Sequence, residues 1–154
     1  MPYFVLYPLI FAPNIMMILS ALSLGQSNPF RQASIIGLIG VLVLVSATYW
    51  SSDPAKPWFL AGVFLGFYTW LNAVVGFFKR HSWLRYVGQS LVGFALLAGC
   101  LYGAAYWSAA TPLRKVPQYF TVFMATVVFE ILAQFVVGIM RGIAQWAGTE
   151  HFMD

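Results

Sequence analysis

Long runs of hydrophobic residues, separated by short polar clusters, dominate the chain. Each run is close to the roughly 20 residues that an α-helix needs to cross the hydrocarbon core of a bilayer. The clusters between the runs are rich in Gly, Pro, Ser, Asn and Lys, which is typical of turns. The pattern predicts an all-α polytopic bundle that forms a single transmembrane domain. Its five spans are expected at about residues 3–24, 33–50, 58–78, 83–107 and 118–140, followed by an interfacial tail at 141–154.

The composition supports a membrane protein. Hydrophobic residues make up 61% of the 154 residues, charged residues only 8%, and the mean hydropathy is +0.80. A soluble fold of this size leaves too much of its surface in water to hide so much apolar area. The net charge of +4 is spread over short loops without the basic, aromatic face that grips nucleic acid, so the expected partners are membrane lipids.

Basic residues at the span ends predict the orientation. Arg31, Lys79, Arg80, Arg85 and Arg141 belong to one predicted side, and Lys56, Arg114 and Lys115 to the other. Because Lys and Arg accumulate on the inner side of a membrane, this five-to-three bias predicts an inside C-terminus and an outside N-terminus.

The residue that least fits the apolar pattern is Glu130. A carboxyl group at bilayer depth costs several kcal/mol unless it is paired, hydrated or protonated. At 100° per residue, Thr126, Glu130, Gln134 and Arg141 fall on one helix face and form a polar stripe. The stripe predicts either a relay for protons or cations, or a polar lining for a small solute. The alternative is a structural role, with Glu130 hydrogen bonded to a neighbouring helix.

Other polar residues lie inside the predicted spans. Asn14, Asn72 and Gln89 could converge with Glu130 to line a pocket. The alternative is ordinary hydrogen bonding between helices. No cofactor is indicated, and the sequence holds no pattern for a metal site, because its two histidines lie in a loop and in the tail and it has one cysteine.

Glycines recur in pairs at four-residue spacing. Such pairs let helix backbones approach closely, either within the chain or between subunits. The predicted packing positions are Gly62, Gly66, Gly99, Gly103, Gly138 and Gly142.

Three stretches resemble the UreI/AmiS family of small-amide channels. They are residues 29–38, 65–70 and 112–117. That family has six spans where this chain has room for five, and no residue role is transferred from it. The resemblance favours a channel.

Three functional hypotheses follow, of which the first is favoured. Minimal loops and the absence of a catalytic cluster favour an accessory or assembly subunit of a larger membrane complex, with Glu130, Gln134 and Arg141 meeting a partner helix or a second copy. The second is a channel or carrier for a small neutral solute or protons. The third is a membrane-embedded enzyme acting on a lipid-soluble substrate, for which no catalytic residue is predicted.

Overall fold

The computed structural model describes residues 29–78 and 83–148, and these form four long helices and one short 3-10 turn. The helices are α2 (Pro29–Trp50), α3 (Lys56–Phe78), α4 (Trp83–Ser108) and α5 (Pro117–Trp146), with η1 (Leu113–Lys115) before α5. The prediction of an all-α fold is confirmed. All four helices are long and apolar enough to cross a membrane, as expected of an integral membrane protein. The first predicted span, 3–24, lies outside the described residues.

The observed helix ends differ from the predicted ones by a few residues. Helix α2 begins at Pro29 rather than at residue 33, and α5 begins at Pro117. Proline suits the first turn of a helix, because its fixed φ is helical and the missing N–H would have no partner there. Helix α5 also continues past the predicted end at Met140 to Trp146, through part of the predicted tail.

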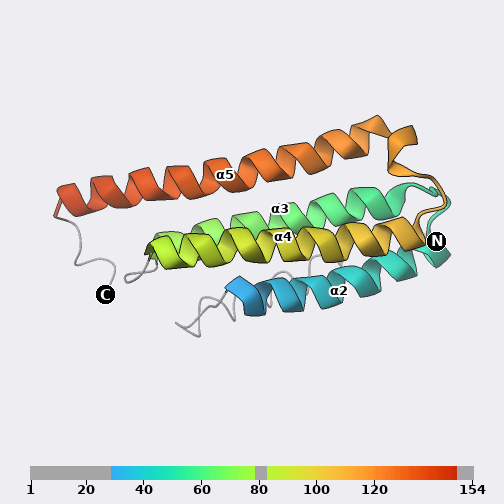
Figure 1. Ribbon diagram of the computed structural model, residues 1–154, viewed down its shortest axis with the longest axis horizontal. Coiled ribbons are helices and arrows are strands. Elements are labelled where there is room, and N and C mark those ends of the chain that lie inside the picture. The colour runs from blue at the N-terminus through green and yellow to red at the C-terminus, as the bar shows by residue number, and fades with distance from the viewer. Residues whose placement is uncertain (1–28, 79–82, 149–154) are drawn as a thin grey trace.

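Neighbouring helices along the chain run in opposite directions, so α2 is parallel to α4 and α3 is parallel to α5 (Figure 1). Helix α3 lies centrally and packs against α2, α4 and α5, while α2 packs against α3 and α4. The longest helix, α5, extends beyond the others at one end (Figure 1). We call the end where α2 and α4 begin the arginine end, because Arg31, Arg85 and Arg141 lie towards it, and the opposite end the Asp53 end.

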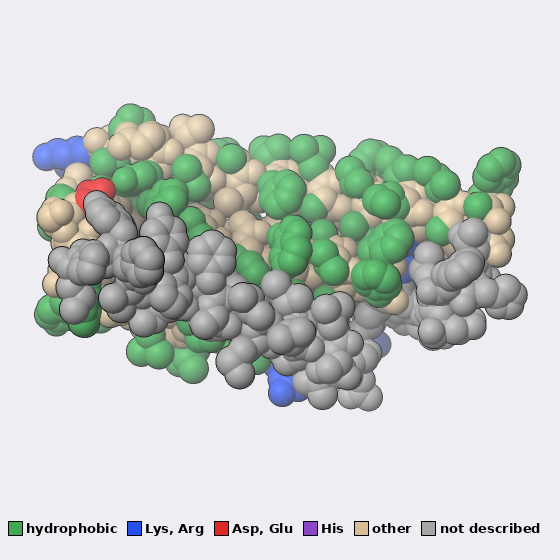
Figure 2. Space-filling model, turned by 180° about the vertical axis from the view of Figure 1, so that it is seen from behind, with side chains coloured by type: hydrophobic (Ala, Val, Ile, Leu, Met, Phe, Trp, Pro, Cys, Tyr) green, Lys and Arg blue, Asp and Glu red, His purple; other side chains and the backbone are tan. Residues whose placement is uncertain are grey.

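Apolar side chains fill the interior and also cover the outside. Leu44, Ala61, Leu65 and Leu101 are fully buried between the helices. Hydrophobic side chains also cover much of the outer face in Figure 2, as expected where lipid rather than water is the solvent. Within this apolar interior, the few buried polar side chains are the candidates for a functional site.

Candidate functional site

The contacts between α3 and α5 set which residues share a depth in the bundle. A Cβ built on Gly62 would lie 2.6 Å from Val122 Cγ1, and one built on Gly66 would lie 3.8 Å from Thr126 Cγ2. Because the two helices are parallel, this register carries on and brings Thr69 and Asn72 to the depth of Glu130 and its next turn. The buried polar residues of α3 and α5 therefore lie side by side.

Glu130 is the centre of a closed hydrogen-bonded ring. The Ser90 hydroxyl on α4 donates to Glu130 Oε1 at 3.0 Å. The Gln134 amide, one turn further along α5, donates to Glu130 Oε1 and to Ser90 Oγ, each at 3.2 Å. Ser90, Glu130 and Gln134 are 0%, 1% and 4% exposed. The ring thus satisfies one carboxyl oxygen of Glu130 with two donors and links α4 to α5.

A second group of polar side chains adjoins the ring and ties in α3. The Tyr68 hydroxyl donates to the Ser90 backbone carbonyl at 3.0 Å, and the Tyr86 hydroxyl donates to Asn72 Oδ1 at 2.8 Å. The Asn72 amide in turn donates to the Tyr68 carbonyl at 3.0 Å. Since Tyr68, Asn72 and Tyr86 are almost completely buried, these bonds fix the side chains around the ring.

Several buried polar atoms in the same region have no hydrogen-bond partner within the described residues. They are Glu130 Oε2, Gln134 Oε1, Thr69 Oγ1 and both amide atoms of Gln32 on α2. Leaving such groups unpaired in an apolar interior costs about 1–3 kcal/mol each, so a water molecule, a proton or a small polar guest is expected to satisfy them.

The predicted polar stripe is buried within the chain, although its members do different things. Thr126 bonds to the Phe123 carbonyl of its own helix at 2.7 Å. Arg141 donates from one guanidinium nitrogen to the Gly76 and Phe77 carbonyls, at 3.1 and 3.0 Å. Its side chain therefore binds the last carbonyls of α3. The stripe faces α3 and α4 of the same chain, so the expectation that it meets a partner helix is not what this geometry favours.

The predicted pocket residues separate. Asn72 joins the polar cluster, whereas Gln89 is half-buried on α4 and its neighbour Ser90 enters the ring instead. Asn14 lies outside the described residues. Sequence reasoning missed Ser90, Tyr68 and Tyr86. Ser90 and Tyr86 share an α4 face with Phe94, Leu97 and Leu101, and this face is the signal that could have revealed them.

The predicted packing glycines also separate. A Cβ on Gly62 would meet Val122, and one on Gly138 would meet the Trp83 ring at 2.6 Å, so both lie at tight helix contacts. Gly66 lies in the same α3–α5 contact as Gly62 with ordinary spacing. Gly99, Gly103 and Gly142 have open space within the described part of the chain, and Cys100 beside Gly99 is exposed.

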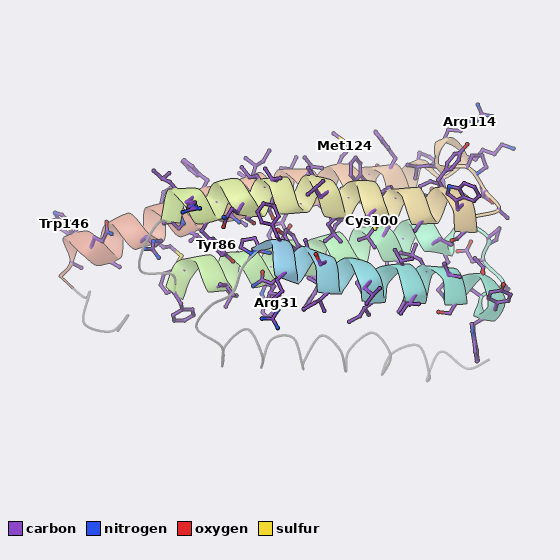
Figure 3. All side chains as sticks on the ribbon, turned by 60° about the horizontal axis from the view of Figure 1, so that its bottom comes forward. Arg31, Tyr86, Cys100, Arg114, Met124 and Trp146 are labelled. Carbon is purple, nitrogen blue, oxygen red and sulfur yellow. The ribbon has the colours of Figure 1, made fainter. Side chains whose placement is uncertain are left out.

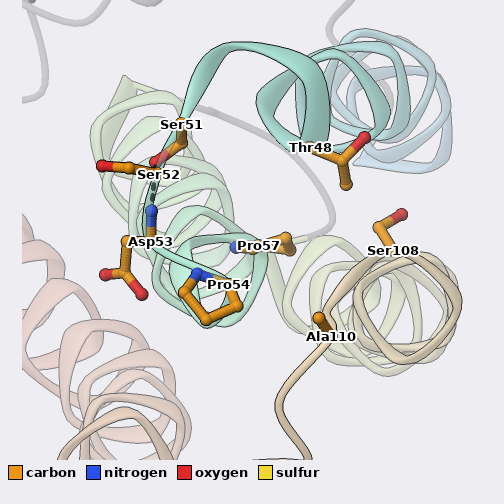
Figure 4. A pocket seen from close by; sticks show the side chains of 8 residues that line it. All are labelled: Thr48, Ser51, Ser52, Asp53, Pro54, Pro57, Ser108 and Ala110. Atoms are coloured by element: carbon orange, nitrogen blue, oxygen red, sulfur yellow. Dashed lines mark hydrogen bonds between the residues drawn. The ribbon is translucent and has the colours of Figure 1, made fainter.

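A polar pocket of about 180 Å³ lies at the Asp53 end (Figure 4). Most of its polar side chains are engaged by the chain itself. Asp53 accepts a bond from the Ala55 N–H at 2.9 Å and one from the Tyr119 hydroxyl at 3.3 Å. Thr48 and Ser108 bond to carbonyls of their own helices. The pocket is a hollow between helix ends, and the hydrogen bonds of its side chains stabilise the turns and helix ends around it. Its lining is Thr48, Ser51, Ser52, Asp53, Pro54, Pro57, Ser108 and Ala110.

Within residues 29–78 and 83–148, no group of three or more His, Cys, Asp or Glu side chains could hold a metal ion. No protein-family model, curated protein or solved structure matches the chain. The feature of the chain that bears on function is therefore the geometry around Glu130.

Proposed function

We propose that the protein is a membrane channel or carrier for protons or a small neutral solute, with Glu130 at its binding site. The supporting observation is a 1% exposed carboxyl whose Oε1 is held by Ser90 and Gln134 while its Oε2 has no partner in the described residues. Ionisable groups inside a bilayer are costly and characteristically mark the paths of ions and protons.

A proton fits the free atoms of this site. Glu130 Oε2 and Gln134 Oε1 both lack a donor when the carboxyl is ionised. A proton on Oε2 removes the buried charge and converts one of the two acceptors into a donor. A water molecule or a neutral solute with N–H or O–H groups would supply donors to the same two oxygens. A proton, a water molecule and a neutral solute with N–H or O–H groups therefore all match the hydrogen-bonding chemistry of the site.

Flux through liposomes that contain only this protein tests the proposal. The wild type is expected to collapse an imposed pH gradient, read with a trapped pH-sensitive dye, or to pass a small neutral solute, read by light scattering. Glu130→Gln keeps the shape of the side chain and removes the exchangeable proton. It is expected to lower the proton flux at least about tenfold, which corresponds to about 1.4 kcal/mol in the barrier.

Asp53→Asn is the matched control, because it makes the same change of carboxyl to amide at an exposed site at the bundle end. It is expected to leave the flux unchanged. Equal flux in the wild type and in Glu130→Gln, or no flux of either kind in the wild type, would contradict the proposal.

An accessory subunit is the second candidate, supported by a different feature. Among the described residues nothing lies close to Gly99 and Gly103 on α4, so another helix could approach the α4 backbone closely there. Native mass spectrometry of the protein extracted gently from its own membrane tests this. A heterologous partner in fixed ratio supports the accessory role, and a monomer or a homo-oligomer argues against it.

The sequence bias of basic residues supports a proposed orientation with the C-terminus inside. The first predicted span, at residues 3–24, would then place the N-terminus outside.

A further inference from the structure

The Glu130 site is much closer to one end of the bundle than to the other. Along α4, at 1.5 Å per residue, Ser90 lies about 10 Å from the start of the helix at Trp83 but about 27 Å from its end at Ser108. Helix α2 begins at the same depth, since the Pro29 carbonyl lies 3.5 Å from a Cβ built on Gly93. Measured along α4, the site is therefore shallow from the arginine end and deep from the Asp53 end, while α5 continues for sixteen residues, about 24 Å, past Glu130 towards the arginine end.

Charged residues at the outside of the bundle agree with this depth. Arg31, in the first turn of α2, is exposed, and it lies near Tyr86 along the length of the bundle (Figure 3). An arginine side chain in a membrane protein reaches for the headgroup region. The headgroup region at this end is therefore expected close to Arg31. Along the bundle, Arg31 lies at about the same depth as Ser90.

The polarity of the interior changes at Glu130. Towards the arginine end lie the buried side chains of Gln32, Asn72, Tyr86, Gln134 and Arg141. Towards the Asp53 end, Thr126 is followed by a mainly apolar interior, in which the Tyr102 hydroxyl is buried without a partner among the described residues. That interior is built from Leu44, Ala61, Phe64, Leu65, Leu97 and Leu101, of which none is more than 3% exposed. Water is stabilised by polar partners and not by an apolar packed core.

We infer that the Glu130 site, in this conformation, exchanges with water through the arginine end and is closed towards the Asp53 end. This access route rests on the proposed transport function, although the route itself can be measured without measuring transport. The route passes Arg141, whose positive charge disfavours cations relative to a neutral solute.

Cysteine accessibility to a charged, membrane-impermeant thiol reagent tests the route in the full-length protein. All variants carry Cys100→Ala, because Cys100 is exposed on α4. Ala133→Cys places the reporter beside Gln134, at a buried position on the arginine side of Glu130. Ala61→Cys is the matched control, a buried alanine in the apolar half at 0% exposure. Ser90→Cys is a second reporter of nearly the native size.

Cysteines at the exposed positions Ser52 and Gln145 report which face of the membrane the reagent has reached. Ser52→Cys is expected to react only from the Asp53 side and Gln145→Cys only from the arginine side. Ala133→Cys and Ser90→Cys are expected to react from the arginine side at least about tenfold faster than from the other side, and Ala61→Cys from neither side.

Reaction of Ala133→Cys and Ser90→Cys from the Asp53 side, equally from both sides or from neither side would overturn the inference, as would reaction of Ala61→Cys. The flux assay separates this result from the proposed function. Flux that depends on Glu130 without one-sided labelling removes only the route. One-sided labelling without any flux removes the transport function and leaves the route.

Discussion

At the scale of single residues, the burial of Glu130 depends on its two donors. Ser90 and Gln134 both bond to Oε1, and Gln134 also bonds to Ser90 Oγ, so each member of the ring is held by the other two. A hydrogen bond to a buried carboxyl is worth about 1.5–3 kcal/mol when the carboxyl is charged and about 1 kcal/mol when it is neutral. The carboxyl is thus held in one orientation with its second oxygen left available.

Removing the Ser90 hydroxyl is expected to destabilise the bundle. Ser90→Ala leaves the Gln134 amide with one acceptor fewer and Glu130 with one donor fewer, at a cost of about 1–3 kcal/mol. Ser34→Ala is the control, because the Ser34 hydroxyl bonds only locally, to the Phe30 carbonyl, at an exposed position. Reversible unfolding in detergent measures both variants. Equal stability of Ser90→Ala and Ser34→Ala would show that the ring does not hold the carboxyl.

At the scale of helices, close packing depends on where a glycine faces. Gly62→Ala brings a methyl group to 2.6 Å from Val122 Cγ1, so α3 and α5 have to move apart or Val122 has to shift. Overpacking of this kind costs about 1–3 kcal/mol. Gly99→Ala meets open space and gains up to about 1 kcal/mol from helix propensity. Thermal unfolding of the two variants is expected to shift in opposite directions, and loss of stability in Gly99→Ala would instead indicate a close contact at that position.

The end of α3 is tied to α5 by Arg141. Its guanidinium donates to the Gly76 and Phe77 carbonyls, which belong to the last turn of α3. Arg141→Gln shortens the side chain and removes these bonds, so a loss of about 1–3 kcal/mol in the free energy of unfolding is expected. Arg85→Gln removes the same charge at an exposed position of α4 and is expected to have little effect. If the two variants lose equal stability, charge at this end of the bundle matters more than the bonds to α3.

At the scale of the whole molecule, the sequence predicted the helices better than the site. Hydrophobic runs near 20 residues located α2, α3, α4 and α5, because span length is set by the bilayer. The polar face of α5 indicated that Glu130 and Gln134 share a side. Ser90 could not be identified in the same way, since a single serine in an apolar helix is common. Its partner Glu130 lies forty residues away and is brought near only by helix packing.

The helix ends show the same limit. Arg141 suggested the end of the last span because a charge normally marks the membrane surface. In the folded chain, α5 continues as a helix to Trp146, and Arg141 donates to two carbonyls of α3. Such pairing between helices is invisible in the local sequence, so a charged residue alone does not locate the end of a helix.

The orientation of the whole bundle decides what the one-sided route does. Helices α2 and α4 begin, and α3 and α5 end, at the arginine end, so Arg31, Arg85 and the C-terminus of α5 belong to the same half. A reporter fused after residue 154 is expected to be active only as a cytoplasmic enzyme, and one inserted at Ser52 only as an exported enzyme. With that result, Glu130 would exchange protons or solute with the cytoplasm in this conformation, and its release to the other side would require a second conformation. The opposite result reverses the side from which Glu130 is loaded, because the access route is fixed to the bundle, whichever way the bundle is inserted.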